Sequence, residues 1–77
     1  MKKATYKEIP DLIRNRQSFV GNSCHAIRFG GHYEIYSYDT LIYDDVEGQN
    51  VYFNTKRYSP TTSKLQNIIR RAYELDK

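Results

Sequence analysis

The sequence has no tryptophan, only one cysteine and no long apolar run. A membrane-spanning helix needs about 18 or more consecutive apolar residues, and no segment approaches that length. The lysines at positions 2 and 3 are not followed by the apolar stretch of a signal peptide. The single Cys24 excludes an internal disulfide and a cysteine-rich zinc site, and it is typical of a reducing compartment. We therefore expect a cytoplasmic protein without a membrane partner.

Aliphatic residues are also few, and the chain is short. A domain of 77 residues buries only about 60% of the surface that its unfolded chain exposes, so the core must be small. This length predicts a single domain over residues 1–77. Eight tyrosines and three phenylalanines supply most of the bulky apolar area, and every tyrosine hydroxyl needs water or a hydrogen-bond partner. Some tyrosines must therefore reach the surface.

The charge balance is mildly basic. Twelve lysines and arginines stand against nine aspartates and glutamates, which gives a net charge of +3 and a pI near 9.1. A protein dedicated to clamping nucleic acid is usually much more basic. The charge thus permits an anionic partner without requiring one.

Two segments have the periodicity of amphipathic helices. In the first, spacings of three and four residues place five side chains on one face: Tyr6, Ile9, Leu12, Ile13 and Arg16. This helix starts either at Thr5, which has capping-box spacing to Glu8, or at Pro10, which suits a first helical position. The second helix has the strongest periodic signal of the chain, and its apolar stripe consists of Leu65, Ile68, Ile69, Ala72 and Tyr73.

The segment between the two helices has the composition of β-strands, and a glycine pair at positions 30 and 31 predicts a hairpin within it. A two-residue turn at the glycines would place Ile27 beside Glu34. A three-residue loop that also includes His32 would place Ile27 beside Ile35. We favour the three-residue loop because it pairs apolar residues with each other.

The remaining strands are assigned from the alternation of apolar residues. The alternation slips between Ser37 and Thr40, which predicts a bulge or bend within one long strand. Residues 44–49 are polar and predict a connection, after which Val51 and Phe53 alternate as core residues of a last strand. The order predicts an α+β domain with two layers, an α-β-β-β-α arrangement with a three-stranded antiparallel sheet.

Three local patterns coincide along the chain: FVGNS at 19–23, YEIYSYDTLI at 33–42 and RYSPTTSKLQNIIRRA at 57–72. Together they resemble the motifs F-x-G-N-S, Y-S-Y-x-T-x-I and Y-S-x-T-T-S-x-H-Q of a family of small proteins encoded by bacteriophages and related mobile elements. Leu65 stands where that family has histidine. The resemblance covers nearly the whole chain and implies a phage or prophage origin, and hence a place of action in the cytoplasm of a bacterial host cell. It implies no catalytic activity.

The hydroxyl residues of the segment SPTTSK (59–64) can be interpreted in two ways. Ser59 before Pro60 fits a helix cap or short turn, and Ser63 with Gln66 fits a capping box one turn later, where the long helix would begin. Alternatively, free backbone N–H groups, the hydroxyls and nearby cations form an anion site that a phosphate would fit. We favour the cap, although four hydroxyls in five residues are more than a cap needs.

Several cations lie near these hydroxyls. The surface that we predict to bind an anion or a partner consists of Arg57, Ser59, Thr61, Thr62, Ser63, Lys64, Gln66, Arg70 and Arg71. On an exposed sheet face, Tyr36, Tyr38 or Tyr52 would stack on bases if the partner were nucleic acid. The plainer interpretation is a solvated helix face with half-buried tyrosines. Exposed tyrosine with arginine is equally typical of a protein interface.

The other polar residues do not predict chemistry. Cys24 and His25 are adjacent, so on a strand they point to opposite faces and cannot form a nucleophile and base pair. We expect Cys24 to be a small buried hydrophobe. His25 and His32 lack a third ligand, and the acidic residues of 44–47 fit a turn rather than a calcium loop. The sequence therefore predicts no catalytic residue, metal or cofactor.

These observations favour a protein that is not an enzyme but binds a host protein or complex stoichiometrically. Inhibition of a host defence system, in the manner of an anti-CRISPR protein, is the expected role. The alternative is a nucleic-acid-binding module that uses the basic helix edge and the turn from Ser59 to Gln66. An edge strand in so small a sheet can pair with its copy, so the sequence is compatible with a monomer and with a homodimer.

Overall fold

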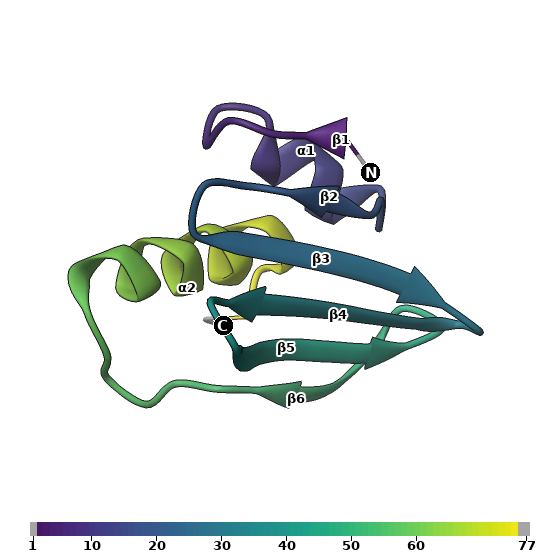
Figure 1. Ribbon diagram of the computed structural model, residues 1–77. Coiled ribbons are helices and arrows are strands. Elements are labelled where there is room, and N and C mark those ends of the chain that lie inside the picture. The colour runs from purple at the N-terminus through teal and green to yellow at the C-terminus, as the bar shows by residue number, and fades with distance from the viewer. Residues whose placement is uncertain (1, 76–77) are drawn as a thin grey trace.

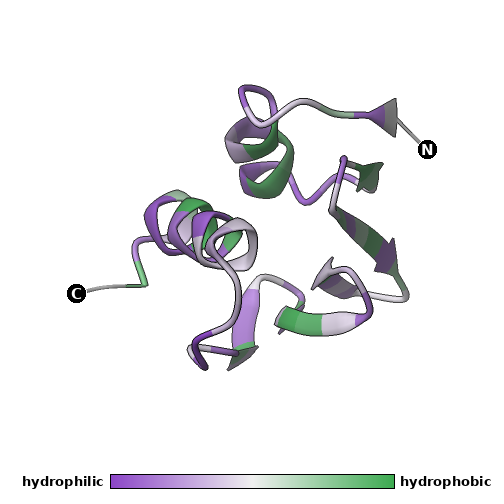
Figure 2. Cartoon of the chain, turned by 60° about the vertical axis from the view of Figure 1, so that its left-hand side comes forward, coloured by the Kyte–Doolittle hydropathy of each residue, from purple (hydrophilic) through white to green (hydrophobic). Residues whose placement is uncertain are grey.

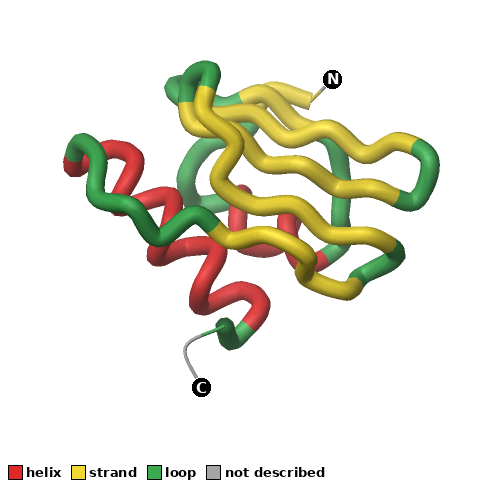
Figure 3. Tube along the Cα trace, turned by 90° about the horizontal axis from the view of Figure 1, so that it is seen from below, coloured by secondary structure: helices red, strands yellow, loops and turns green. Residues whose placement is uncertain are grey.

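The computed structural model describes residues 2–75, which form one sheet with two helices on the same side of it (Figures 1 and 3). The strands are β1 (Lys2–Lys3), β2 (Phe19–Val20), β3 (Cys24–Phe29), β4 (His32–Ser37), β5 (Thr40–Val46) and β6 (Gln49–Phe53), and the helices are α1 (Ile9–Arg14) and α2 (Pro60–Tyr73). Strands β2 to β6 form an antiparallel meander, and β1 joins β2 in parallel. The predicted α+β class is confirmed, but the expected number of three strands was wrong.

Two of the additional strands, β1 and β2, are two-residue strands that precede β3, and the third arises at a turn that the sequence pattern did not separate. Ser37 pairs with Thr40 across a two-residue turn, where we predicted a bend within one strand. Residues 44–46, expected in a polar connection, continue β5. The next turn consists of Glu47 (φ 52°) and Gly48 (φ 86°). Two positive φ angles in a two-residue loop are typical of a type I′ turn, whose twist matches that of the flanking strands.

The β3–β4 hairpin has the register that we did not favour. Its turn consists of Gly30 (φ 50°) and Gly31 (φ 86°) alone, so Ile27 lies opposite Glu34 and not opposite Ile35. Glycine adopts these angles without the steric penalty that a Cβ atom brings. The turn chemistry therefore decides the register, and the expected three-residue loop was wrong.

The residues on the inner side of the sheet explain why pairing apolar residues with each other predicted the wrong register for this hairpin. On β3 the buried side chains are the small Cys24 and Ala26, while the larger Ile27 points to the other side. On β4 the buried side chains are Tyr33, Ile35 and Ser37. Small residues on one strand leave room for the tyrosine and isoleucine of the next, so the core alternates in size as well as in polarity.

In the pairs β4–β5 and β5–β6, irregular pairing changes which side chains face the core. Between β4 and β5 it allows two consecutive residues, Ile42 and Tyr43, both to be buried. Between β5 and β6 it leaves Val51 without an opposite residue, and 57% of the surface of Val51 is exposed. The prediction that Val51 faces the core was therefore wrong, whereas Phe53 packs against the core as expected.

Helix α1 uses both start signals that the sequence offered. The amide of Thr5 donates a 3.2 Å hydrogen bond to Glu8 Oε1, which forms half of a capping box. The regular helix begins at Ile9 and has Pro10 in its first turn. Its buried side, Ile9, Leu12 and Ile13, packs into the core as the periodicity predicted.

Helix α2 begins earlier than expected, at Pro60, with Ser59 as its N-cap, so the predicted start near Ser63 was wrong. Its predicted apolar stripe is confirmed: Leu65 and Ile69 are buried, and Ile68, Ala72 and Tyr73 pack against the core. Figure 2 shows the hydrophobic residues of both helices on the sides turned toward the sheet and toward each other. The core thus lies between one side of the sheet and the helix pair.

One ion pair is enclosed in this core. Asp45 has no exposed surface, and its Oδ1 accepts a 2.6 Å hydrogen bond from Arg16 Nη2, which also donates to Gly31 O at 2.9 Å. Tyr43 OH donates to the other carboxylate oxygen at 3.1 Å. The hydrogen bond to Asp45 raises the pKa of Arg16. Arg16 was expected on the apolar face of the first helix, but it lies beyond the end of α1 with a positive φ of 51°.

We predict that Asp45→Asn lowers the free energy of unfolding by about 3 kcal/mol, because it removes one charge of a buried pair and leaves the arginine uncompensated. The matched control is Asp11→Asn, since Asp11 pairs with Arg14 on the surface with side-chain exposures of 81% and 54%. That change should cost less than about 1 kcal/mol. Urea unfolding followed by circular dichroism measures both, and equal losses in the two variants would contradict the expected role of Asp45.

Three buried or half-buried tyrosines surround the ion pair. Tyr33 OH donates to Gln17 O at 2.8 Å, and Tyr73 OH donates to Ile13 O, so both bind the chain in or just after α1. The rings of Tyr43 and Tyr73 are stacked with their centroids 4.8 Å apart. Burial, followed by nearby negative or phenolic groups, raises the pKa of all three phenols.

These raised pKa values predict a loss of stability in alkali. The unfolded-state pKa of tyrosine is about 10, so above that pH the unfolded chain releases the three protons while the folded chain keeps them. The stabilising contribution is complete below about pH 10 and falls as the pH rises, by up to about 1.4 kcal/mol per pH unit for each tyrosine. Urea unfolding at a series of pH values measures this slope. Tyr73→Phe should reduce it relative to the exposed control Tyr38→Phe, and an unchanged slope would contradict the prediction.

Candidate functional site

The hydroxyl residues at the start of α2 act largely within the protein. Ser59 Oγ accepts a hydrogen bond from Thr62 N at 3.4 Å, which caps the helix. Thr62 is buried, and its hydroxyl shares a 2.8 Å hydrogen bond with Ser37 Oγ of β4. Thr61 and Ser63 are half-buried. The geometry therefore supports the capping interpretation for Ser59, and it makes Thr62 a link between helix and sheet.

Gln66 also has a structural partner. It was expected to form a capping box with Ser63, but its Nε2 donates to Asn54 O at 2.7 Å and to Lys56 O at 3.0 Å. Asn54 in turn accepts from the amide of Lys56 at 2.9 Å and donates to Tyr58 OH at 3.0 Å. Two side-chain amides thus hold the segment that connects β6 to α2.

The predicted cations surround two shallow depressions beside α2. The first, of about 230 Å³, is lined by Thr55, Arg57, Ser63, Gln66, Asn67 and Arg70. The second, of about 460 Å³, is lined by Pro60, Ser63, Lys64, Asn67, Ile68 and Arg71. Ser63 and Asn67 line both depressions, so the four cations Arg57, Lys64, Arg70 and Arg71 belong to one region. We call it the α2 basic surface.

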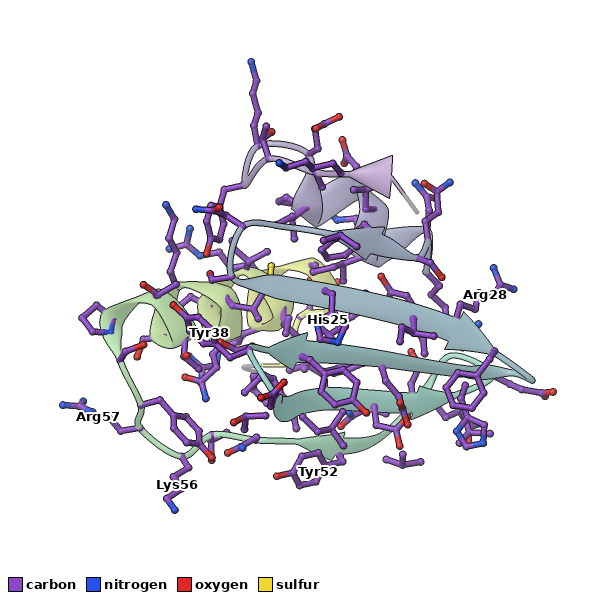
Figure 4. All side chains as sticks on the ribbon, viewed as in Figure 1. His25, Arg28, Tyr38, Tyr52, Lys56 and Arg57 are labelled. Atoms are coloured by element: carbon purple, nitrogen blue, oxygen red, sulfur yellow. The ribbon has the colours of Figure 1, made fainter. Side chains whose placement is uncertain are left out.

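The cations of this surface differ in how they are held. Arg70 Nη1 donates to Asn67 Oδ1 at 2.9 Å, and its guanidinium lies 5.6 Å from the ring centroid of Phe53. Lys64 Nζ lies 4.3 Å from the ring centroid of Tyr6. Arg57 is exposed, and Figure 4 shows it projecting away from the body of the protein. Three cations of the α2 basic surface, Arg57, Lys64 and Arg71, are therefore exposed to solvent, and Arg70 is half-buried.

The predicted aromatic contacts lie on a different side of the molecule. Figure 4 shows His25 and Tyr52 on the side of the sheet that faces away from the helices, and Tyr36 is paired with His25 on the same side. Within residues 2–75 no helix covers this side, which we call the open face. The sheet separates Tyr36 and Tyr52 from the helix cations, so the structure does not bring the predicted tyrosines and cations together on one surface.

Tyr38 belongs to neither surface. It lies in the β4–β5 turn with a φ of 55°, and 60% of its surface is exposed. A bulky side chain is uncommon at a positive φ, where glycine or asparagine is less strained. Packing does not explain the choice of tyrosine at this turn.

Cross-strand pairing arranges the open face in three rows of side chains. The first row contains His25, Tyr36 and Leu41, the second Ile27, Glu34, Asp44 and Tyr52, and the third Phe29, His32 and Val46. The exposed fraction is 50% for Phe29, 44% for Tyr52 and 38% for Val46. The open face thus presents large apolar side chains to solvent.

Stacked rings flank the middle row. The rings of His25 and Tyr36 are nearly parallel at 4.9 Å, and those of Phe29 and His32 are stacked at 5.5 Å. Tyr36 OH donates a 2.9 Å hydrogen bond to Glu34 Oε1, and this bond raises the pKa of Tyr36. These contacts fix the side chains of the first and third rows, so the open face has a defined shape.

Comparison with known protein families gives one match. A family model described as a family of unknown function (DUF8033) matches residues 7–75. The chain belongs to this family. No curated protein and no solved structure matches the chain. The range matched by the DUF8033 model contains both the α2 basic surface and the open face.

Outside these two surfaces, the described residues offer neither an exposed thiol nor a group of metal ligands. Cys24 is buried, as expected, and burial raises the pKa of its thiol. Among residues 2–75, no three histidine, cysteine, aspartate or glutamate side chains are grouped so that they could hold a metal ion. No helix in this part of the chain is long and apolar enough to cross a membrane.

Sequence reasoning missed the acidic residues of the open face. Glu34 was treated only as an unfavourable neighbour for Ile27, and Asp44 was assigned to a polar turn. The available signal was the alternation of residues 32–37, in which His32, Glu34 and Tyr36 share one side of β4. Combined with a two-residue glycine turn, that alternation places Ile27 and Glu34 together on the outside.

We predict that Thr62→Val lowers the free energy of unfolding by about 1–3 kcal/mol, because it leaves the buried hydroxyl of Ser37 without its partner. The matched control is Thr61→Val, one residue earlier and half-buried, which should change stability by about 0.5 kcal/mol or less. Urea unfolding compares the two. A larger loss in the Thr61 variant would show that the structural link has been assigned to the wrong hydroxyl.

Proposed function

We propose that this protein is a phage-encoded accessory protein that binds a host protein or complex stoichiometrically through its open face. Binding would inhibit a host function such as a defence system. The observation that carries the proposal is one side of the sheet without a covering helix, on which large apolar side chains are exposed. The phage origin rests on the resemblance of the three sequence motifs.

The composition of the open face favours a protein partner. Contiguous exposed apolar residues on a small soluble protein commonly mark an interaction site. Here Ile27 and Tyr52 lie at the two ends of the middle row, and Phe29 and Val46 belong to the third. Exposed aromatic residues such as Phe29 and Tyr52 are typical of protein interfaces.

The charges of the open face oppose a nucleic acid at the same place. Glu34 and Asp44 lie in the middle row, where they would repel a phosphate backbone. The lysines and arginines that would attract phosphates lie instead on the α2 basic surface and on the connection before it. Protein binding and phosphate binding are thus expected on different surfaces.

The internal polar contacts support binding without catalysis. The closest pairs of side chains join Arg16 to Asp45 and Ser37 to Thr62, and both hold elements of the fold together. A structural role accounts for both pairs. The side chains that remain accessible on the open face are suited to contact with a partner.

A second candidate function is binding of nucleic acid by the α2 basic surface. It is favoured by the placement of Arg57, Lys64, Arg70 and Arg71 around Ser63 and Asn67. Such binding would weaken steeply with salt because each phosphate contact releases counterions. A protein interface centred on Tyr52 would weaken much less.

The test is a pull-down from bacterial lysate with the tagged full chain, with and without nuclease. We expect wild type to retain one host protein in a fixed ratio after nuclease, and Tyr52→Asp to retain at least about tenfold less, since a charge at an aromatic contact disrupts it. The matched control is the double variant Arg70→Ala, Arg71→Ala, which should retain the host protein. Circular dichroism confirms that all three are folded.

Other outcomes identify the other functions. Loss of the retained material on nuclease treatment, together with loss in the double arginine variant, would support nucleic-acid binding in place of the proposal. Analytical ultracentrifugation of the protein alone tests for a homodimer. If wild type is a dimer and Tyr52→Asp is a monomer, the open face is covered by a second copy, and the proposal of a host partner at this face is overturned.

A further inference from the structure

Two carboxylates lie opposite each other in the middle of the open face. Glu34 of β4 pairs with Asp44 of β5, and each is followed in its strand by a buried residue, Ile35 or Asp45, so both belong to the open face. Like charges at facing positions of an antiparallel pair destabilise the sheet. The core does not require acidic residues here, because both side chains are on the outer side. Their presence therefore calls for an explanation outside the folding of the chain.

The negative charges are poorly compensated within the protein. Glu34 accepts a hydrogen bond from the neutral phenol of Tyr36. Asp44 Oδ1 lies 3.8 Å from His32 Nδ1, a contact that is an ion pair only when the imidazole is protonated. This oxygen is inaccessible to solvent and accepts no hydrogen bond from residues 2–75, although 19% of the Asp44 side chain is exposed. An inaccessible acceptor without a donor is unfavourable, because it has lost its hydrogen bonds to water and gained none from the protein.

Asp45, which follows Asp44 in the sequence, shows how this protein compensates the charge of a buried carboxylate. Asp45 points into the core and is bound by the guanidinium of Arg16 through two nitrogens, at 2.6 and 3.3 Å. Neither Glu34 nor Asp44 has such an ion pair with a lysine or arginine in the described chain. The chain thus supplies an arginine to the inner carboxylate and none to the outer pair.

The surroundings of the outer pair favour one kind of cation. The His25–Tyr36 stack lies in the row on one side and the Phe29–His32 stack in the row on the other. A cation above the middle row would be partly removed from water by these rings. A guanidinium is planar, is weakly hydrated, binds carboxylates with two parallel hydrogen bonds and lies well against aromatic rings. An ammonium group has none of these four properties to the same degree.

We propose that the partner of the open face inserts an arginine side chain, carried on an apolar segment, between the two ring stacks to contact Glu34 and Asp44. The proposal rests on the proposed function and specifies the chemistry of the partner. The arginine relieves the repulsion between the carboxylates, while the apolar residues beside it cover Ile27, Val46 and Tyr52. Charge complementarity then fixes the orientation of the partner on the sheet.

The test uses a random peptide library displayed on particles and selected on the immobilised full chain. Selected peptides should contain an arginine flanked by aliphatic or aromatic residues. Isothermal titration calorimetry of single peptides should show at least about a tenfold loss of affinity when that arginine is replaced by glutamine, as expected for a paired charge at an interface. Glu34→Gln and Asp44→Asn should cause similar losses. The matched control is Asp39→Asn, an exposed acid in the β4–β5 turn, which should retain wild-type affinity.

A double-mutant cycle distinguishes direct contact from a general charge effect. Replacing the peptide arginine should cost little against Asp44→Asn, because its partner has already been removed. If the arginine is equally important against wild type and Asp44→Asn, or if selected peptides lack arginine, the proposal is overturned.

The outcomes also separate this proposal from the proposed function. One outcome is that selected peptides bind wild type, Glu34→Gln and Asp44→Asn equally well but do not bind Tyr52→Asp. The open face would then remain a docking surface, and the proposal of an inserted arginine would be overturned. If no peptide is selected, or if Tyr52→Asp binds all of them as wild type does, the open face is not a docking surface for a protein segment and both proposals are overturned.

Discussion

The ion pair between Arg16 and Asp45 is the contact on which the arrangement of helices and sheet depends. A chain of this length has a small core, and its helix α1 has only six residues. Arg16 follows that helix and binds both the carboxylate of β5 and the carbonyl of the β3–β4 turn, so one side chain joins the N-terminal segment to two hairpins. The hydroxyls of Tyr33 and Tyr73 reinforce the same junction through backbone carbonyls. Polar contacts inside the core thus supplement the limited apolar burial.

This arrangement places both helices on one side of the sheet, and no helix of residues 2–75 covers the other side. Consecutive residues of a strand point in opposite directions, so Asp44 and Asp45 have opposite environments although they are chemically identical. The inner carboxylate is enclosed with an arginine of the chain, and the outer one is half-buried beside a second acid. The contrast between them locates the surface at which an external partner is expected.

Helices were predictable from the sequence because their periodicity depends on neighbours within one turn. The apolar stripe of α2 was correct, and so were Ile9, Leu12 and Ile13 of α1. The first turn of α2 was misplaced, and Tyr6 and Arg16, predicted on the face of the first helix, lie outside α1. The strands were less predictable because a turn at Tyr38 and Asp39 has no glycine or proline to mark it. The burial of Asp45 was not predictable, since its partner lies 29 residues away. The cations of the α2 basic surface were identified by composition, but a register error of one residue hid the open face by exchanging the two sides of β3.

Several residues of the three sequence motifs have structural roles. Gly21 lies where a Cβ atom would come within 2.8 Å of Cys24 Sγ, Ser59 caps α2, and Ser37 is hydrogen-bonded to Thr62. These three residues maintain the fold, whereas Tyr36 of the same motifs belongs to the open face. Proteins that share all of the motif residues can still differ at Ile27, Asp44 and Tyr52, which lie outside the three segments. Most of the residues proposed to contact a partner thus lie outside the motifs, so the sequence of the open face can change while the motifs stay the same.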